Sequence, residues 1–364
     1  MTIATPRPLS AVLAERWNRS TLLRHLSIAV VGLAGYYLLS ISLDAFHDLQ
    51  LAQISYTAIA AAGLTVLSGL SGQISLGHGA LMAVGAYTVA LLIGNEGWAV
   101  LPALVAAVAV TALVGAPVGL AASRLRGPYL AGATLAFAVG LPALADKFPA
   151  TFGGENGLTI NPPTPPSFLG ANFPLERWEA WIACAGALVV MFALYNLTHS
   201  GIGRSMRAVR DDEIAASLCG MRVSRSQTVA FIVSAACAGL GGGLLTVVLQ
   251  LAQPGAFPLQ LSLSLLTGIV LGGLGSLVGA IWGAALLVLL PNWTNDLAHS
   301  FSLSTKVSAN LPLAIYGVVL IGAMLLWPSG IQGGVLALGR RLRDRRGGPA
   351  APPGAASGQA GVAS

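Results

Sequence analysis

The feature that most constrains this chain is its succession of apolar runs, each about as long as a lipid bilayer is thick. A hydrocarbon core about 30 Å thick is crossed by roughly 20 helical residues. Only 9% of the 364 residues are charged, which is too few to cover a soluble domain of this size. The sequence therefore predicts an all-α integral membrane protein. Runs of spanning length occupy residues 26–43, 50–70, 98–122, 128–146, 179–197, 228–250 and 310–327.

Two further apolar stretches are interrupted by glycine and are expected to form broken-helix hairpins. Residues 79–94 follow a polar, glycine-rich turn, and residues 259–290 are too long for one span and break at residues 272–276. With them, about ten membrane segments are expected. Small residues at four-residue spacing favour close packing between membrane helices. The glycines expected to pack in this way are Gly239, Gly243, Gly272, Gly275, Gly279 and Gly283.

The basic residues indicate the orientation of the chain, because cytoplasmic loops of membrane proteins retain Lys and Arg. With ten spans and a cytoplasmic N-terminus, 16 of the 19 basic residues lie inside. The three outside are Lys147, Arg177 and Lys306. Both termini are therefore expected in the cytoplasm, residues 1–25 as a short leading segment and residues 328–364 as a largely disordered tail.

Two long loops are expected within a membrane domain of residues 26–327. The outside loop, residues 147–178, contains six prolines and is expected to be stiff and without regular structure. The cytoplasmic loop, residues 198–227, contains five arginines, and its middle lacks proline and glycine. That composition predicts a short helix, in which Arg207 and Asp211 would pair one turn apart.

The stretch from Ser68 to Gly79 is the most polar one at membrane depth, and its glycines would interrupt a helix. Irregular backbone is tolerated there only where protein or a water-filled cavity satisfies its polar groups. Such segments often lie beside substrate pathways. Two interpretations stay open: Gln73, Ser75 and His78 line a translocation pathway, or they cap the broken helix and bond to neighbouring spans.

Three motifs resemble the permeases of importers of the ABC superfamily. Residues 213–220, Glu-x-Ala-Ala-x-x-x-Gly, are similar to the EAA loop, the short helix that such permeases insert into a groove on their ATPase subunits. Residues 69–79 and 270–276 resemble glycine-rich stretches of the permeases of branched-chain amino acid importers in particular. The resemblance covers about residues 50 to 330. In the outside loop, Phe152 stands where the family usually has Thr.

The resemblance implies a permease subunit in the bacterial cytoplasmic membrane, which forms the pathway for branched-chain amino acids or related small amino acids and amides. It implies a second permease subunit, two cytoplasmic ATPase subunits and an extracytoplasmic substrate-binding protein as partners. The coupling helix is expected to continue into the span that begins near Thr228. The residues implied to couple to the ATPase are Arg207, Arg210, Asp212, Glu213, Ala215, Ala216 and Gly220.

Several chemistries are not expected of this chain. A phosphate-binding Gly-x-x-x-x-Gly-Lys-Ser/Thr loop needs a lysine after glycine, and neither Lys147 nor Lys306 follows one. We therefore expect no enzymatic activity and no bound cofactor, with ATP used by the partner subunits. Cys184, Cys219 and Cys237 match no metal-ligand spacing, so no metal site is expected. No nucleic-acid partner is expected either.

The alternative is a secondary transporter that moves a small solute along an ion gradient. Such carriers use carboxylates embedded in the membrane. All 13 acidic residues of this chain are expected in loops or at span ends, with Asp146 and Glu179 nearest the membrane. A purely structural membrane protein would not explain the charged cytoplasmic loop. The importer permease is therefore the favoured hypothesis.

Overall fold

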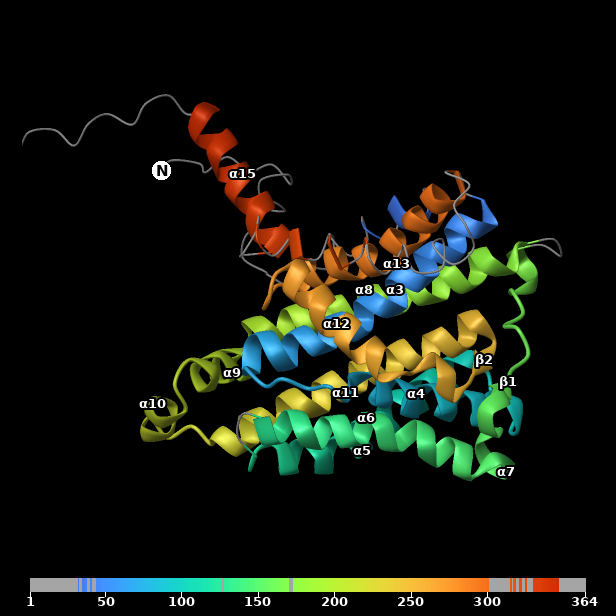
Figure 1. Ribbon diagram of the computed structural model, residues 1–364, viewed down its shortest axis with the longest axis horizontal. Coiled ribbons are helices and arrows are strands. Elements are labelled where there is room, and N and C mark those ends of the chain that lie inside the picture. Colours follow the sequence, from blue (N-terminus) through green and yellow to red (C-terminus); the bar gives the residue numbers. More distant parts are fainter. Residues whose placement is uncertain are drawn as a thin grey trace, which may run out of the picture.

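The computed structural model of the chain is a bundle of helices that run along one common axis (Figure 1). It describes residues 44–125, 128–169, 173–300 and 330–346, together with isolated residues between 32 and 40 and between 315 and 325. In chain order, the elements are α3 (Ala45–Leu64), the π-helical turn η1 (Thr65–Leu70), α4 (His78–Gly94), α5 (Val100–Ala122), α6 (Pro128–Lys147), α7 (Pro149–Phe152), η2 (Gly154–Asn156), β1 (Leu158–Thr159), η3 (Ser167–Leu169), α8 (Leu175–His199), α9 (Gly201–Asp211), α10 (Glu213–Leu218), α11 (Val223–Leu249), β2 (Leu251–Ala252), η4 (Pro254–Ala256), α12 (Leu259–Gly272), α13 (Leu277–Ser300) and α15 (Gly330–Arg346).

Seven helical segments among the described residues are long and apolar enough to cross a membrane, and α4 is a shorter apolar helix. The prediction of an all-α membrane protein is confirmed. Three of the observed helices, α3, α8 and α11, begin before the predicted apolar runs, because they include the more polar residues that precede them. For example, α3 begins at Ala45 and α8 at Leu175. The predicted spans at residues 26–43 and 310–327 lie largely outside the described residues.

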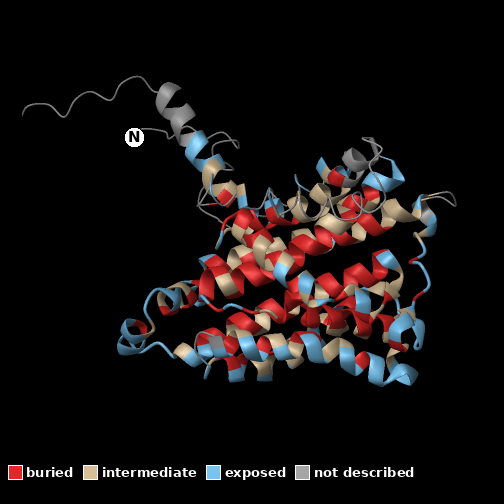
Figure 2. Ribbon diagram, viewed as in Figure 1, coloured by how far each residue is buried: buried red, intermediate tan, exposed pale blue. Residues whose placement is uncertain are grey.

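Helix α11 lies at the centre of the bundle and contacts α3, α4 and α5. The small residues of α11 allow these neighbouring helices to pack closely, and α11 is buried along most of its length (Figure 2). A Cβ atom added at Gly239 would lie 2.6 Å from Thr111 Cβ in α5. One at Gly243 would lie 2.8 Å from Val89 Cγ2 in α4. Larger side chains at these positions would push the helices apart.

The second glycine-rich stretch forms a pair of tightly packed helices, α12 and α13. A Cβ atom at Gly279 would lie 2.9 Å from the carbonyl carbon of Gly272, and one at Gly283 would lie 2.6 Å from that of Gly268. The connection contains Gly275, whose φ of +83° is readily adopted only by glycine. Helix α13 then continues to Ser300, ten residues beyond the expected end of the stretch at residue 290.

The first glycine-rich stretch does not form a compact hairpin as expected. The π-helical turn η1 ends at Leu70, residues 72–77 are not helical, and α4 starts at His78. Helix α4 packs mainly on α5 and α11 and has few contacts with α3. The reason lies in the small residues of α11, because the carbonyl group of Gly239 approaches α4 directly at Gly85.

The proline-rich loop differs from its expected irregular form. It contains the short helices α7, η2 and η3, and strand β1 pairs antiparallel with β2, with Leu158 opposite Ala252 and Thr159 opposite Leu251. The amide of Ile160 also donates to the carbonyl of Gln250 over 3.0 Å. This pairing gives the extended backbone hydrogen-bond partners from the chain that leaves α11.

The C-terminal tail was expected to be largely disordered from residue 328, and this is wrong for its first half. Gly330–Arg346 forms helix α15, which extends away from the bundle (Figure 1). Its first residue packs on Gly273, in the connection between α12 and α13. Leu, Ala and Arg favour a helix in this segment. Residues 347–364 lie outside the described residues.

The close packing of α12 and α13 generates a stability prediction. Gly283→Ala should lower the free energy of unfolding by about 1–3 kcal/mol, because its methyl group would overlap the backbone of Gly268. Gly132→Ala is the matched control: it lies in α6 with nothing within 4 Å of the added Cβ, so it should raise the free energy by roughly 0.5–1 kcal/mol. Denaturant titration of the isolated chain in detergent measures both. Equal effects of the two substitutions would contradict this packing.

Candidate functional site

The cytoplasmic loop predicted at residues 198–227 is the segment that projects furthest from one end of the bundle, here called the α10 end (Figure 1). It forms two short helices, α9 and α10, where the sequence predicted one. Asp212 separates them, because its backbone is extended and its side chain accepts hydrogen bonds from the amides of Ile214 (2.8 Å) and Ala215 (3.0 Å). Asp212 is therefore the N-cap of α10.

Helix α10 presents apolar side chains to its surroundings. Ile214 and Leu218 lie one turn apart and are 73% and 83% exposed. Ala215 is also exposed, whereas Ala216 is buried against the chain. Exposed apolar side chains that lie together in this way are typical of surfaces that contact another protein or a membrane.

Gly220 makes the chain turn back after α10. Its φ is +82°, and the amides on either side of the turn donate to α10 carbonyls, Gly220 to Ser217 (3.0 Å) and Met221 to Ala216 (3.1 Å). Nothing lies within 4 Å of an added Cβ atom, so the backbone conformation alone favours glycine. The predicted continuity with the following span is wrong, because this turn separates α10 from α11.

Two arginines of α9 bind backbone carbonyl groups of the membrane bundle. Arg207 donates to Thr198 at the end of α8 over 3.0 Å, which replaces the expected pair with Asp211. Arg210 donates to the carbonyl of Gly69, at the end of η1, over 2.6 Å, and it also pairs with Asp211. A Cβ atom at Gly69 would lie 2.5 Å from the amide nitrogen of Gly275. Arg210 therefore reaches the point where the two glycine-rich connections meet.

Glu213, which the family resemblance implies to couple to the ATPase, makes a contact within the chain. It does not cap α10, since Asp212 does. Its Oε1 accepts a hydrogen bond of 2.8 Å from Nε2 of Gln227, in the first turns of α11. This bond ties the start of α10 to the start of the central helix.

The polar turn at residues 72–77 is held from three sides. The amide of Leu76 donates to Thr134 Oγ1 of α6 (3.0 Å), and that of Gly79 donates to Ser262 Oγ of α12 (2.9 Å). Nε2 of His78 bonds to the carbonyl of Ala60 in α3 (2.9 Å). His78 and Ser75 are completely buried. The bond of His78 to α3 is of the kind that the second interpretation of this turn expects, whereas Ser75 accepts a bond from the amide of Gly77 within the turn (3.3 Å).

Gln73 differs from Ser75 and His78 because it borders a cavity of about 710 Å³ at the α10 end, here called the glutamine pocket. The cavity lies between the polar turn, the end of α5, the start of α6 and the starts of α10 and α11. Its lining residues are Ser71, Gly72, Gln73, Ile74, Ser123, Leu125, Leu130, Ala131, Glu213, Val223, Ser224 and Gln227.

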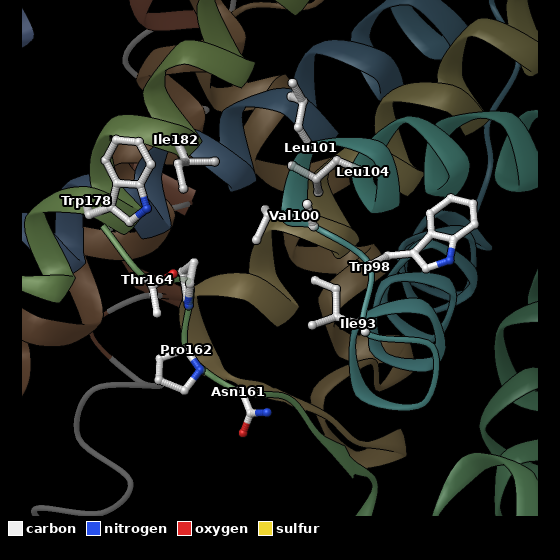
Figure 3. A pocket seen from close by; sticks show the side chains of 13 residues that line it. Ile93, Trp98, Val100, Leu101, Leu104, Asn161, Pro162, Thr164, Trp178 and Ile182 are labelled. Carbon is white, nitrogen blue, oxygen red and sulfur yellow. The ribbon is translucent and has the colours of Figure 1, made fainter. Parts of the chain in front are cut away.

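A second cavity of about 550 Å³, here called the tryptophan pocket, lies at the opposite end, which carries β1 and β2. Figure 3 shows Trp178 and Ile182 of α8 on one side and Trp98 near the start of α5 on the other. Asn161 and Thr164 come from the proline-rich loop. The walls are mostly apolar, as in pockets that accept aliphatic groups.

Two carboxylates near the β1 end lie close to the starts of their spans, as expected for acids of this chain, but both are buried. Asp48 of α3 is 1% exposed and binds Arg177 (3.2 Å) and Ser40 (2.7 Å). Glu179 of α8 is 3% exposed and accepts a bond of 3.2 Å from Gln250. Helices α3 and α8 pack side by side with their first turns at the same end, which encloses these groups.

Sequence reasoning missed several residues that position the site. Thr134 and Ser262 bond to the polar turn, but each is an isolated polar residue in an apolar run. Gly69 belongs to the glycine-rich motif of residues 69–79, but the motif alone does not indicate its contacts with Arg210 and Gly275. Asp212 could have been found as an N-cap, because Asp directly before Glu-Ile-Ala-Ala is a typical helix start.

These features define a class: a polytopic helical membrane protein with a pair of short helices projecting from one end and glycine-lined breaks within its spans. The family model described as branched-chain amino acid transport system / permease component matches residues 48–327. The chain belongs to this family. Its relatives are transport components rather than enzymes. The chain is a multi-pass protein of the bacterial cytoplasmic membrane.

Individual relatives agree with the family. The high-affinity branched-chain amino acid transport system permease protein LivM of Salmonella typhimurium is 34% identical over 250 residues, 62% of this chain and 58% of the relative. LivH of Escherichia coli, with the same description, is 26% identical over 76% of this chain and 91% of its own length. The ribose import permease protein RbsC of Escherichia coli is 29% identical over 77% and 84%. The chain thus spans less than two thirds of LivM. No solved structure matches it.

Proposed function

We propose that the chain is the membrane-spanning permease subunit of an ABC importer for branched-chain amino acids or related small amino acids and amides. It forms part of the translocation pathway and couples to separate ATPase subunits, which bind and hydrolyse the ATP. The observation that carries this proposal is the exposed apolar face of α10, Ile214 and Leu218, on a helix that stands beyond the bundle. The LivM and LivH relatives support the substrate class.

The proposed orientation places the α10 end in the cytoplasm and the β1 end outside, with ten membrane segments and both termini inside. Basic residues support this arrangement. Arg204, Arg207 and Arg210 lie in α9, and α15, which ends in arginines, starts on the α12–α13 connection at the same end. Lys147 and Arg177 lie at the opposite ends of their helices, near the β1 end. Positive charge is retained on the cytoplasmic side.

In the proposed complex, α10 inserts into a groove on an ATPase subunit. The small side chains of Ala215 and Ala216 let the helix backbone approach the walls of the groove closely. Gly220 allows the sharp turn by which the chain leaves the groove. Asp212 fixes the start of the helix, so that the exposed apolar face keeps one direction.

Movement of the ATPase would pass into the bundle through α9 rather than along a continuous helix. Arg210 binds the carbonyl of Gly69, and Gly69 touches Gly275. A shift of α9 therefore acts on both glycine-rich connections at once. Gln73, four residues beyond Gly69, borders the glutamine pocket, and we assign it to the inner part of the pathway. Ser75 and His78 position this turn from inside the protein.

The second permease subunit is proposed to cover the outer face of α6. Only 22% of the apolar stretch of this helix is buried within the chain, against 72% for α3 and α11. Gly132, Ala136 and Gly140 are exposed at four-residue spacing, and both glycines have open space beside them. Small residues at this spacing permit close approach of another membrane helix.

The substrate-binding protein is proposed to dock on the β1 end, where the proline-rich loop and the tryptophan pocket lie. The apolar walls of that pocket suit an aliphatic side chain on its way into the pathway. Phe152, at which the loop departs from the family pattern, packs edge-on against Tyr87 of α4 with ring centroids 5.2 Å apart. Phe152 thus packs the proline-rich loop against the helix bundle.

One observation favours the alternative, a carrier driven by an ion gradient. Glu179 is a buried carboxylate whose observed partner is the neutral Gln250. Such a group can exchange a proton. Membership of the permease family favours the importer, and the experiments below separate the two.

The first experiment is a pull-down of the tagged chain from mild detergent, with its cellular partners present. The wild type should retain a nucleotide-binding ATPase. Gly220→Val should lose it, because valine at φ +82° costs about 1–3 kcal/mol and displaces α10. Gly201→Val, at the exposed start of α9, is the control and should retain the ATPase. If Gly220→Val kept the ATPase and ATP-driven uptake, the docking assignment would fail.

The second experiment tests the contact between α9 and the bundle. Arg210→Met keeps the side-chain length but removes the bond to Gly69, which is worth about 1.5–3 kcal/mol. ATPase binding should persist, while uptake should fall by about tenfold to a hundredfold. Arg204→Met, which loses a bond to the carbonyl of His199 instead, should transport normally. Loss of the ATPase in Arg210→Met, or unchanged uptake, would refute this route.

A further inference from the structure

We infer that the glutamine pocket is a binding site for the ammonium group of a small aliphatic amine or amino acid, held by Glu213 and Gln73. The inference deepens the proposed function and rests on it for the identity of the natural ligand. The chemistry of the site is argued from the pocket alone.

The size and position of the pocket suit a small solute. Its volume of about 710 Å³ lies within the range of small-molecule sites. It is bordered by the polar turn on one side and by the starts of α10 and α11 on the other. A molecule bound there would touch both the break in the membrane helices and the coupling segment.

Two buried polar side chains of the pocket are unsatisfied. The side-chain oxygen of Gln73 and the hydroxyl of Ser71 have no hydrogen-bond partner among the described residues, and the two side chains are only 6% and 4% exposed. A buried polar group that is left without a partner destabilises the folded protein. Both residues line the pocket, so a bound donor would supply the missing bonds after a small rotation of either side chain.

The charge of the pocket selects a cation. Glu213 is the one charged side chain among the described residues that line it. One of its oxygens accepts from Gln227, which leaves the carboxylate with further acceptor sites. A carboxylate, an amide oxygen and a hydroxyl together match the three donors of a primary ammonium group.

The rest of the lining explains why an organic cation fits better than a metal ion. Ile74, Leu125, Leu130 and Val223 supply apolar walls beside the polar groups. An aliphatic chain attached to the ammonium group would bury its surface against them. A bare metal ion would gain nothing from these walls.

Binding at this site would also affect the coupling helices. An ammonium group on Glu213 would share the carboxylate with Gln227, and the bond between Glu213 and Gln227 ties α10 to α11. Solute that accumulates at the α10 end would therefore act on the contact between the coupling segment and the central helix. The site gives the importer a way to sense its own product on the side where it is released.

The test is a saturation-transfer NMR titration of the full chain, with its co-purified partners, in lipid nanodiscs. The probes are isopentylamine, isovalerate and leucine at constant sodium chloride. Isopentylamine and leucine should bind and compete with each other, whereas isovalerate should not. Glu213→Gln, which preserves the bond to Gln227, and Gln73→Met should each weaken amine binding by about tenfold or more. Glu155→Gln, an exposed carboxylate at the β1 end, should change nothing.

Several outcomes would overturn the inference. These are equal binding of isovalerate, unchanged amine binding in Glu213→Gln, or displacement of the amine by added sodium ions. A folded Gln73→Met variant with normal affinity would also exclude Gln73. Failure here leaves ATPase co-purification intact, whereas failure of the proposed function removes the ATPase but not amine binding. The two results are therefore distinguishable.

Discussion

The structure depends on one constraint: backbone polar groups at membrane depth need partners within the protein. The chain breaks its helices at residues 72–77, where regular hydrogen bonding stops. Thr134 and Ser262, from two different helices, supply acceptors for the freed amides, and His78 binds α3. The polar turn is thus a fixed part of the bundle, although it is irregular. Its position determines where a pathway and a coupling contact can lie.

Glycine residues determine how closely the helices around this break pack against one another. Close approach of α4 and α5 to α11 requires small residues, and the same holds for α12 and α13. The backbone at Gly69, between α3 and α4, lies directly against the backbone at Gly275, between α12 and α13. Arg210 binds this junction from outside the bundle. A single arginine on a projecting helix therefore contacts the junction of both broken segments.

Sequence reasoning recovered what depends on local pattern. Apolar runs predicted the spans that the structure describes, and small residues at four-residue spacing marked α11 and the α12–α13 pair. It did not recover what depends on distant packing. Asp48 and Arg177 are 129 residues apart and meet only because α3 and α8 lie side by side. Helix α4 packs on α11 rather than on α3 for a similar reason. The small residues that allow this packing lie in a helix more than a hundred residues later in the chain.

The central claim is that this chain moves solute with energy supplied by a separate ATPase. The most direct measurement is uptake of labelled leucine into vesicles that contain the reconstituted complex and its binding protein. The account predicts uptake that needs ATP inside the vesicles and persists when ionophores collapse the proton and sodium gradients. Uptake that ignores ATP and stops with the ionophores would contradict it, and would assign the buried Glu179 to an ion-driven carrier instead.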